Sequence, residues 1–100
     1  MSSPSDIEAQ KALKHALRRH LFQIFILQQP LSPSEAADLV AEPLSLVSYH
    51  VRELVKYKFL ILSSREPVRG TLKNYYVPSE DALAMPSVKR LLSEDRSTPE

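Results

Sequence analysis

A helix predicted between Leu44 and Tyr57 carries hydrogen-bonding side chains on one face and apolar side chains on the other. The polar face consists of Ser45, Ser48, Tyr49, Arg52 and Lys56. The apolar stripe consists of Val47, Val51, Leu54 and Val55, which recur with the helical period. Short polar side chains near the start of a helix, followed by cations, suit insertion into the major groove of DNA. The pattern therefore indicates binding to base edges and phosphates.

Two aromatic side chains of this helix have both a functional and a packing interpretation. Tyr49 lies on the polar face, where we favour a contact with DNA over simple coverage of the helix surface. His50 borders the apolar stripe, so we favour a partly buried packing role over a base contact.

Positive charge is concentrated between Arg52 and Lys73, although the chain as a whole is nearly neutral. The net charge is +1 and the isoelectric point is about 8.0, below the value of about 9 that marks a strongly basic nucleic-acid binder. The segment nevertheless holds six cations and two acidic residues. Three of these cations, Arg65, Arg69 and Lys73, follow the helix and are expected to contact phosphates. An ordinary solvated hairpin is the alternative.

A short helix precedes the polar one, and its start is the clearest local signal in the sequence. Ser32 is the expected N-cap, Pro33 the first helical residue and Glu35 the residue that closes a capping box. The helix should run to about Val40 and bury Ala36, Leu39 and Val40. Pro43 is expected at the first position of the next helix.

The N-terminal part predicts a single helix from a capping box at Ser5 and Glu8 to about Gln28. One face carries Leu13, Ala16, Leu17, Leu21, Ile24 and Phe25. From residue 21 to residue 27 the apolar side chains continue around the helix, which requires more than one burial partner. We expect a second copy of the chain as one partner, contacted by Phe22 and Ile26, because a domain this small has a modest core. A central core helix is the alternative.

The residues after the polar helix predict a β-hairpin and a final helix. An apolar run at 59–62 and a return at 73–77 favour strands, and a loop at 63–71 holds the only glycine. A helical turn or two is expected at 79–84. The last helix, near 86–92, should turn Val88, Leu91 and Leu92 inward, and the polar residues 93–100 are expected to be disordered.

Composition limits the remaining functions. One hundred residues form one domain, 1–100, with an ordered core of about 6–92. The absence of cysteine excludes disulfides, thiolate metal sites and cysteine nucleophiles. No apolar run approaches the roughly 20 residues that span a bilayer, and the N-terminus lacks a secretory signal, so we expect a cytoplasmic protein without membrane contact. One glycine and no nucleophile elbow argue against an enzyme, and we expect no cofactor and identify no small-molecule effector.

No metal site is expected either. His15 and His20 are five residues apart and therefore do not share a helical face. An oxygen and nitrogen site across a dimer, formed from Glu8, His15, Glu94 or Asp95, is the alternative.

Three segments resemble motifs of the ArsR-type winged helix-turn-helix transcriptional regulators. They are His15 to His20 (HALRRH), Leu31 to Ala37 (LSPSEAA) and Val47 to Leu54 (VSYHVREL). Glu66 to Gly70, followed by Tyr75 and Tyr76, resembles the wing of one branch more weakly. The likeness covers roughly residues 12 to 77, with the three motifs in order and at the family's spacing.

The resemblance implies a mainly α fold with a small β-hairpin, a winged helix-turn-helix. It implies a homodimeric DNA-binding repressor, which we place in the non-metal-sensing branch. Helix 44–57 would enter the major groove through Ser45, Leu46, Ser48, Tyr49 and Arg52, with Lys56 on the same polar face. The wing, 63–73, would contact DNA through Arg65, Arg69 and Lys73. The dimer interface would use the first and last helices, and the residues assigned to it are Leu13, Leu17, Phe22, Ile26, Val88, Leu91 and Leu92.

Two positions depart from the family pattern. Leu46 stands where the family often has a polar residue, so one base contact would be apolar, as with a thymine methyl group. Pro43 replaces the usual serine-like cap and leaves the entry angle of the helix open. The competing interpretation is a winged-helix module that binds a protein partner without specific DNA binding, which the nearly neutral charge and Leu46 keep in consideration.

Overall fold

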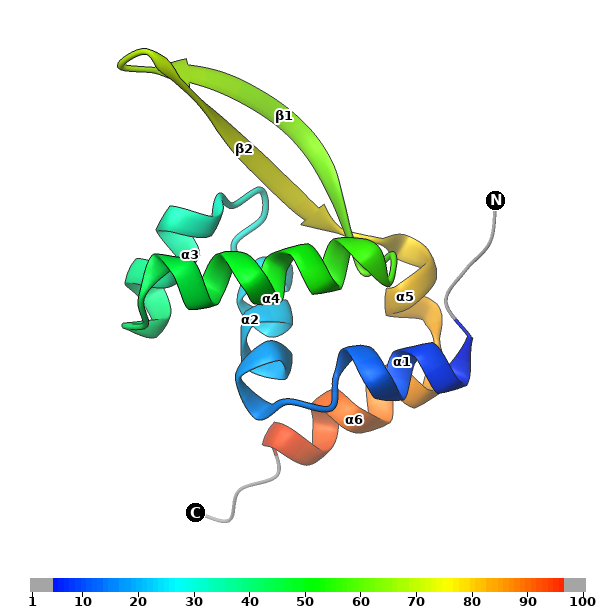
Figure 1. Ribbon diagram of the computed structural model, residues 1–100. Helices are drawn as coiled ribbons and strands as arrows, with labels where there is room; N and C mark the ends of the chain where they lie inside the picture. The colour runs from blue at the N-terminus through cyan, green and yellow to red at the C-terminus, as the bar shows by residue number, and fades with distance from the viewer. Residues whose placement is uncertain (1–4, 97–100) are drawn as a thin grey trace.

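The computed structural model describes residues 5–96, which form a helical body with one projecting β-hairpin (Figure 1). The elements are α1 (Asp6–Ala12), α2 (Ala16–Leu27), α3 (Pro33–Val40), α4 (Leu44–Lys56), β1 (Leu60–Val68), β2 (Thr71–Pro78), α5 (Glu80–Ala84) and α6 (Pro86–Arg96). The predicted fold class, mainly α with a small hairpin, is therefore confirmed. None of the helices within residues 5–96 combines the length and the apolar character that crossing a bilayer requires.

The capping boxes predicted for α1 and α3 are both present. Ser5 Oγ accepts from the backbone N–H of Glu8 at 3.1 Å, and Ser32 Oγ accepts from that of Glu35 at 3.2 Å. Each glutamate also accepts from the backbone N–H of its own N-cap residue. Pro33 occupies the first turn of α3, where its missing N–H costs nothing.

The predicted single helix from Ser5 to Gln28 is wrong, because α1 ends at Ala12 and α2 begins only at Ala16. The break leaves carbonyl groups without helical partners. Nη1 of Arg18 donates to the Ala12 carbonyl at 3.2 Å, and Nη1 of Arg19 donates to the Leu13 carbonyl at 2.7 Å. Two arginines thus stabilise a bend that hydrophobic periodicity could not reveal.

The ends of α4 differ slightly from the prediction. Pro43 is the N-cap and not the first helical residue, and the helix ends at Lys56. Lys58 follows with φ 67°, its N–H donates to the Val55 carbonyl at 3.0 Å, and the Phe59 N–H donates to Leu54 at 2.8 Å. This pair of bonds is a Schellman motif, which turns the chain from α4 towards β1 and buries Phe59.

The hairpin is longer than predicted, and its loop is shorter. The segment expected as a loop at 63–71 is mostly strand, and the turn consists of Arg69 and Gly70. Both have positive φ, 52° and 84°, as a tight hairpin turn of type I′ requires. An irregularity between Leu62 and Ser64 shifts the register of β1. β1 is exposed along nearly all of its length and β2 is mostly half-buried, and neither strand alternates between buried and exposed residues.

The hairpin is fixed to the helical body at two places along β2. Leu31 and Tyr76 exchange backbone hydrogen bonds of 3.1 and 2.9 Å, so the connection between α2 and α3 lies beside β2. Nζ of Lys73 lies 3.6 Å from a carboxylate oxygen of Glu35 on α3. The orientation of the hairpin relative to α3 and α4 is therefore defined by contacts.

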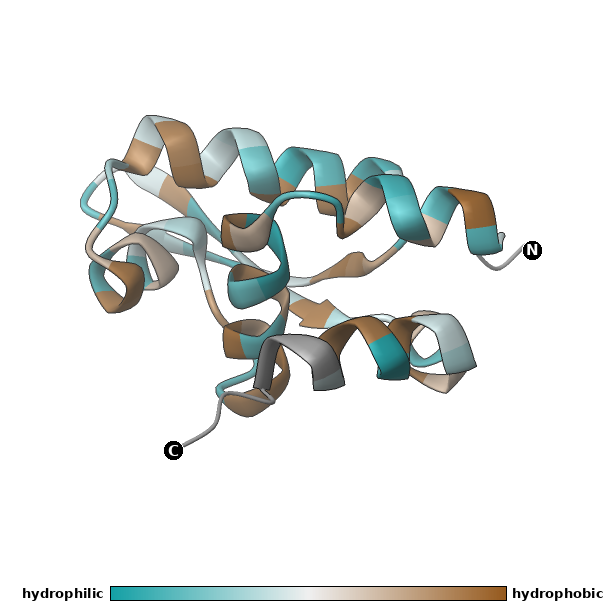
Figure 2. Ribbon diagram, turned by 90° about the horizontal axis from the view of Figure 1, so that it is seen from below, coloured by the Kyte–Doolittle hydropathy of each residue, from teal (hydrophilic) through white to brown (hydrophobic). Residues whose placement is uncertain are grey.

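The core lies between α2, α4 and the elements that flank them. The largest fully buried side chains there are Leu13, Leu21, Phe22, Phe25, Leu54, Phe59 and Leu60. Phe22 and Phe59 meet edge to face, with ring centroids 5.2 Å apart. Figure 2 shows apolar segments on α2, on α4 and on the described part of α6.

Three further predictions about the helices require correction. Leu39, expected to be buried on α3, is exposed, and so is Val55 of the apolar stripe on α4, whereas Val47, Val51 and Leu54 are buried. The helix α6 continues to Arg96, through residues that were expected to be disordered. Residues 97–100, covered by the same prediction, lie outside the described part of the chain.

Candidate nucleic-acid interface

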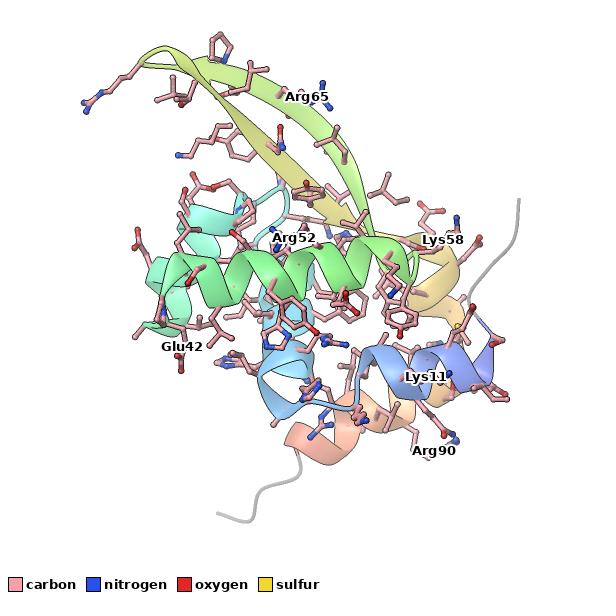
Figure 3. The ribbon with its side chains drawn as sticks, in the orientation of Figure 1. Lys11, Glu42, Arg52, Lys58, Arg65 and Arg90 are labelled. Atoms are coloured by element: carbon pink, nitrogen blue, oxygen red, sulfur yellow. The ribbon has the colours of Figure 1, made fainter. Side chains whose placement is uncertain are left out.

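The face of α4 opposite the core presents a row of donors to solvent. Ser45, Tyr49, Arg52 and Lys56 follow one another at spacings of four, three and four residues, and all four side chains are exposed. Ser48 lies half-buried at one edge of this row, and Leu46, 38% exposed, lies towards the other edge. Figure 3 shows Arg52 midway along α4. The structure thus brings together on one exposed surface the side chains predicted to read DNA.

The buried face of α4 keeps this row fixed in orientation. Ala36 and Ala37 of α3 are small and buried, so α3 and α4 can cross closely. The turn between the two helices is closed by Ala41 in a left-handed conformation, with φ 58°, and by a bond of 3.2 Å from the Glu42 N–H to the Ala37 carbonyl. The two helices cross at an angle (Figure 1), and the exposed face of the second is its polar face.

The three cations predicted for the hairpin do not form one cluster. Arg65 pairs with Asn74 in the register of the strands, and Lys73 pairs with Glu66, so Arg65 and Lys73 lie on opposite faces of the hairpin. Arg65 and Arg69 are exposed, and Arg69 occupies the tip. Lys73 is half-buried beside Glu35 and lies 6.0 Å from the centroid of the Tyr75 ring.

Lys56 also has a local partner. Its Nζ lies 3.9 Å from a carboxylate oxygen of Glu53 and 5.5 Å from the centroid of the Tyr57 ring. The Lys56 side chain remains 66% exposed, and exposed ion pairs at this spacing contribute little to stability. The amine therefore stays accessible to a phosphate.

Tyr49 belongs to a cluster of four side chains, and sequence analysis missed its central member. Arg18, only 3% exposed, donates from Nε to Nδ1 of His50 at 3.2 Å. His50 is itself 6% exposed, as its packing interpretation predicted, and its ring centroid lies 5.1 Å from that of Tyr49 and 5.6 Å from that of His15. Burial, Arg18 and His15 together lower the pKa of His50. The only sequence signal for Arg18 was its place in the HALRRH segment.

The residues predicted for a dimer interface divide into two groups. Leu13, Phe22 and Val88 have no exposed surface, because each packs into the core of a single chain, and this corrects their assignment to an interface. The other four are half-buried, and these are Leu17, Ile26, Leu91 and Leu92. Phe22 therefore follows the alternative interpretation, in which α2 is a core helix of one chain.

A groove lies where α2 and α6 meet. Gln23, Ile26, Leu27 and Leu92 line a volume of about 370 Å³, and Nε2 of Gln23 donates to the Leu92 carbonyl at 3.1 Å. Leu27 is 80% exposed, the most exposed large apolar side chain described, and was not predicted as an interface residue. Ile26 and Leu92 of the predicted set thus share one apolar surface.

No group of three histidine, aspartate or glutamate side chains that could hold a metal ion occurs among the described residues. The side chains of Glu94 and Asp95, named in the alternative metal site, lie outside that part of the structure.

Two solved structures of low sequence identity share this architecture. One is the homodimeric winged helix-turn-helix DNA-binding domain of Mb0332 from Mycobacterium bovis, a possible ArsR-family transcriptional regulator, with a TM-score of 0.63 and 17% identity over 96% of this chain and 87% of that one. The other is the adhesin competence repressor AdcR from Streptococcus pyogenes, with a TM-score of 0.60 and 18% identity over 90% of this chain.

The fold is a winged helix-turn-helix. In it α3 and α4 form the helix-turn-helix, and β1 and β2 form the wing. The chain spans 63% of the AdcR chain, less than two thirds of its length. The sequence matches no family model and no curated protein.

Proposed function

We propose that this winged helix-turn-helix domain is a DNA-binding transcriptional regulator of the ArsR type that acts as a homodimeric repressor. The observation that carries the proposal is the exposed row of Ser45, Tyr49, Arg52 and Lys56 on a helix whose opposite face is fixed in the core. In this mode α4 lies in the major groove, where Arg52 donates to a guanine edge and Lys56 to a phosphate. The wing reaches the flanking backbone through Arg69.

A second copy of the chain fits the surface around the groove between α2 and α6. Leu27 is almost fully exposed there and adjoins Ile26 and Leu92, so covering these side chains removes apolar area from water. The Mb0332 domain, which shares the fold, is homodimeric. Two copies would present two α4 helices to successive turns of a duplex, as paired half-sites require.

The proposed function is binding and involves no catalytic step, cofactor, metal or small-molecule effector. A regulator of this kind works where the chromosome is, so the cytoplasmic location expected from the sequence belongs to the same proposal. Its activity would consist of occupying a site and excluding other proteins from it.

The test is a titration of the protein on two duplexes, one of random sequence and one enriched by the protein from a random pool. Affinity for the random duplex should fall steeply with salt, because each neutralised phosphate releases counterions. Arg52→Ala should cost about 1–3 kcal/mol on the enriched duplex and far less on the random one. The matched control is Arg90→Ala, which removes a cation from α6, a helix that lies apart from α4 (Figure 3). This variant should change the affinity for neither duplex. Equal losses for both variants would contradict the assignment of Arg52 to base recognition.

The second candidate is a winged-helix module that binds a protein partner. The observation that favours it is the apolar start of α4, where Leu44 and Leu46 are both exposed. A parent protein with no measurable affinity for either duplex at low salt would exclude the first candidate and favour this one.

A further inference from the structure

Arg18 is a buried arginine whose hydrogen bonds, in the described part of the chain, go to neutral acceptors. Its Nη1 donates to the carbonyls of Ala12 and Lys11 at 3.2 and 3.4 Å, and its Nε donates to Nδ1 of His50 at 3.2 Å. Burying a charge is costly unless its donors are satisfied. The guanidinium meets that condition by joining the end of α1 to α4, two elements that are distant in the sequence.

The bond to α4 fixes the protonation state of His50. Nδ1 can accept from Arg18 only if it carries no proton, so the neutral ring holds its proton on Nε2. The other charged or titratable groups that face this ring are His15, Glu53 and Tyr49. Burial, Arg18 and His15 lower the pKa of His50, whereas Glu53 opposes them more weakly.

Protonation of His50 would remove the acceptor and place a second cation against Arg18. Because the folded pKa lies below the usual value, the unfolded chain takes up this proton first as the pH falls below about 6.5. The neutral cluster therefore contributes its full stability above that pH and loses it on acidification.

Tyr49 connects this buried cluster to the exposed face of α4. Its ring packs edge to face on His50, the Arg18 Cζ atom lies 6.0 Å from its centroid, and the residue is 46% exposed in the row of donors. The position of the Tyr49 ring thus depends on its contacts with His50 and Arg18.

We propose that Arg18 is a positioning residue for DNA binding: its bond to the neutral ring of His50 fixes Tyr49 on the exposed face of α4, and protonation of His50 releases that contact. This inference rests on the proposed function. It predicts that acid weakens sequence-specific binding. Charge alone would predict the opposite, because added protons strengthen the general attraction to phosphate.

The experiment measures affinity for the enriched and the random duplex in steps from about pH 7.5 down to about pH 4.5, at constant ionic strength. The series extends well below the ordinary imidazole pKa because the folded pKa of His50 is lowered. The parent should lose at least about fivefold in affinity for the enriched duplex on acidification, the lower end of usual coupling between linked equilibria. Its affinity for the random duplex should stay equal or rise. His50→Asn keeps an acceptor oxygen for Arg18 but cannot be protonated there, and it lacks the ring on which Tyr49 packs. It should therefore bind the enriched duplex more weakly than the parent at high pH and show no acid loss. His20→Asn removes an exposed histidine of α2 and should keep the acid loss.

Arg18 itself is tested by a matched pair of variants. Arg18→Lys keeps the charge but lacks the planar fork that reaches His50 and the carbonyls at once. Arg19→Lys perturbs the same junction at the carbonyls of Leu13 and Lys14. Arg18→Lys should bind the enriched duplex at least about fivefold more weakly at high pH and lose the acid dependence, whereas Arg19→Lys should retain both.

Several outcomes would overturn the inference. One is the same acid response in the parent and in His50→Asn, and another is no acid loss in the parent. If a variant fails to fold, the parent still decides: the midpoint of its affinity loss must coincide with Nδ1 protonation of His50, followed by imidazole nitrogen NMR without DNA. A parent that binds neither duplex at any salt concentration overturns the proposed function as well, which separates the two failures.

Discussion

A carboxylate oxygen of Glu35 lies 3.6 Å from Nζ of Lys73, while the other oxygen accepts from the backbone N–H of Ser32 at 3.1 Å. The residue that closes the capping box of α3 therefore also holds the wing. The start of the helix-turn-helix and the strand that returns from the wing tip share one carboxylate. Loss of Glu35 would affect both.

This ion pair predicts unequal roles for two wing cations. Arg69 is exposed at the tip, whereas the charge of Lys73 is already compensated. Arg69→Ala should reduce the magnitude of the salt slope of binding to random DNA by about one unit, because one phosphate contact is lost. Lys73→Ala should change it less. The measurement is affinity at several salt concentrations, and a larger effect for Lys73→Ala would show that this lysine leaves Glu35 when DNA binds.

The two capping boxes predict different costs for the same substitution. Ser32 is fully buried and Ser5 is exposed, although both hydroxyl groups accept from the third residue of their helices. Ser32→Ala should lower the free energy of unfolding by about 1–2 kcal/mol, and Ser5→Ala by about 0.5 kcal/mol. Chemical denaturation of both variants measures the difference. Equal costs would mean that burial adds nothing to the cap.

Phe22 is buried and Leu27 is exposed on the same helix, so substitutions at the two positions should separate the stability of one chain from the assembly of two. Phe22→Ala removes a ring packed against Phe59 and should lower the free energy of unfolding by about 3–5 kcal/mol, whatever the protein concentration. Leu27→Ala should leave that energy of the single chain within about 0.5 kcal/mol but weaken self-association. Thermal unfolding and sedimentation at several concentrations separate the two effects. A monomeric parent would remove the second half of the prediction.

Lys58 predicts a stabilising substitution. Its φ of 67° lies in the left-handed region, which costs a residue with a Cβ atom about 1 kcal/mol relative to glycine. Lys58→Gly should therefore raise the free energy of unfolding by up to about 1 kcal/mol, reduced by the extra freedom of glycine in the unfolded chain. Lys56→Gly, two residues earlier and inside α4, should lower it by about the same amount. The same sign for both variants would contradict the Schellman motif as the end of α4.

Local signals explain which elements sequence analysis predicted well. The boundaries of α3 follow from Ser32, Pro33 and Glu35, and the polar face of α4 follows from helical spacing. Both depend on residues within a few positions of each other, so their physical causes are visible in the sequence. The same holds for Ser79, whose hydroxyl caps α5.

Contacts between distant residues explain the failures. The bend before α2 depends on Arg18 and Arg19 reaching back to carbonyls, and no proline or glycine marks it. Phe22 belongs to the core because Phe59, which follows α4 in the sequence, packs against its ring. The burial of Arg18 likewise depends on an acceptor in another helix, Nδ1 of His50. Periodicity reports how apolar a face is, but it does not identify which partner covers that face.

The wing has a consequence for solubility. Within the described residues β1 pairs only with β2, so its outer edge offers backbone groups to any strand that comes close. Open edges of this kind invite pairing between molecules. Pro67 is compatible with the ladder only if its nitrogen faces outward, which removes one donor from that edge. The charged residues Arg65 and Glu66 directly precede it. The missing donor and the nearby charges of the wing therefore oppose the pairing of copies of the chain into an extended sheet.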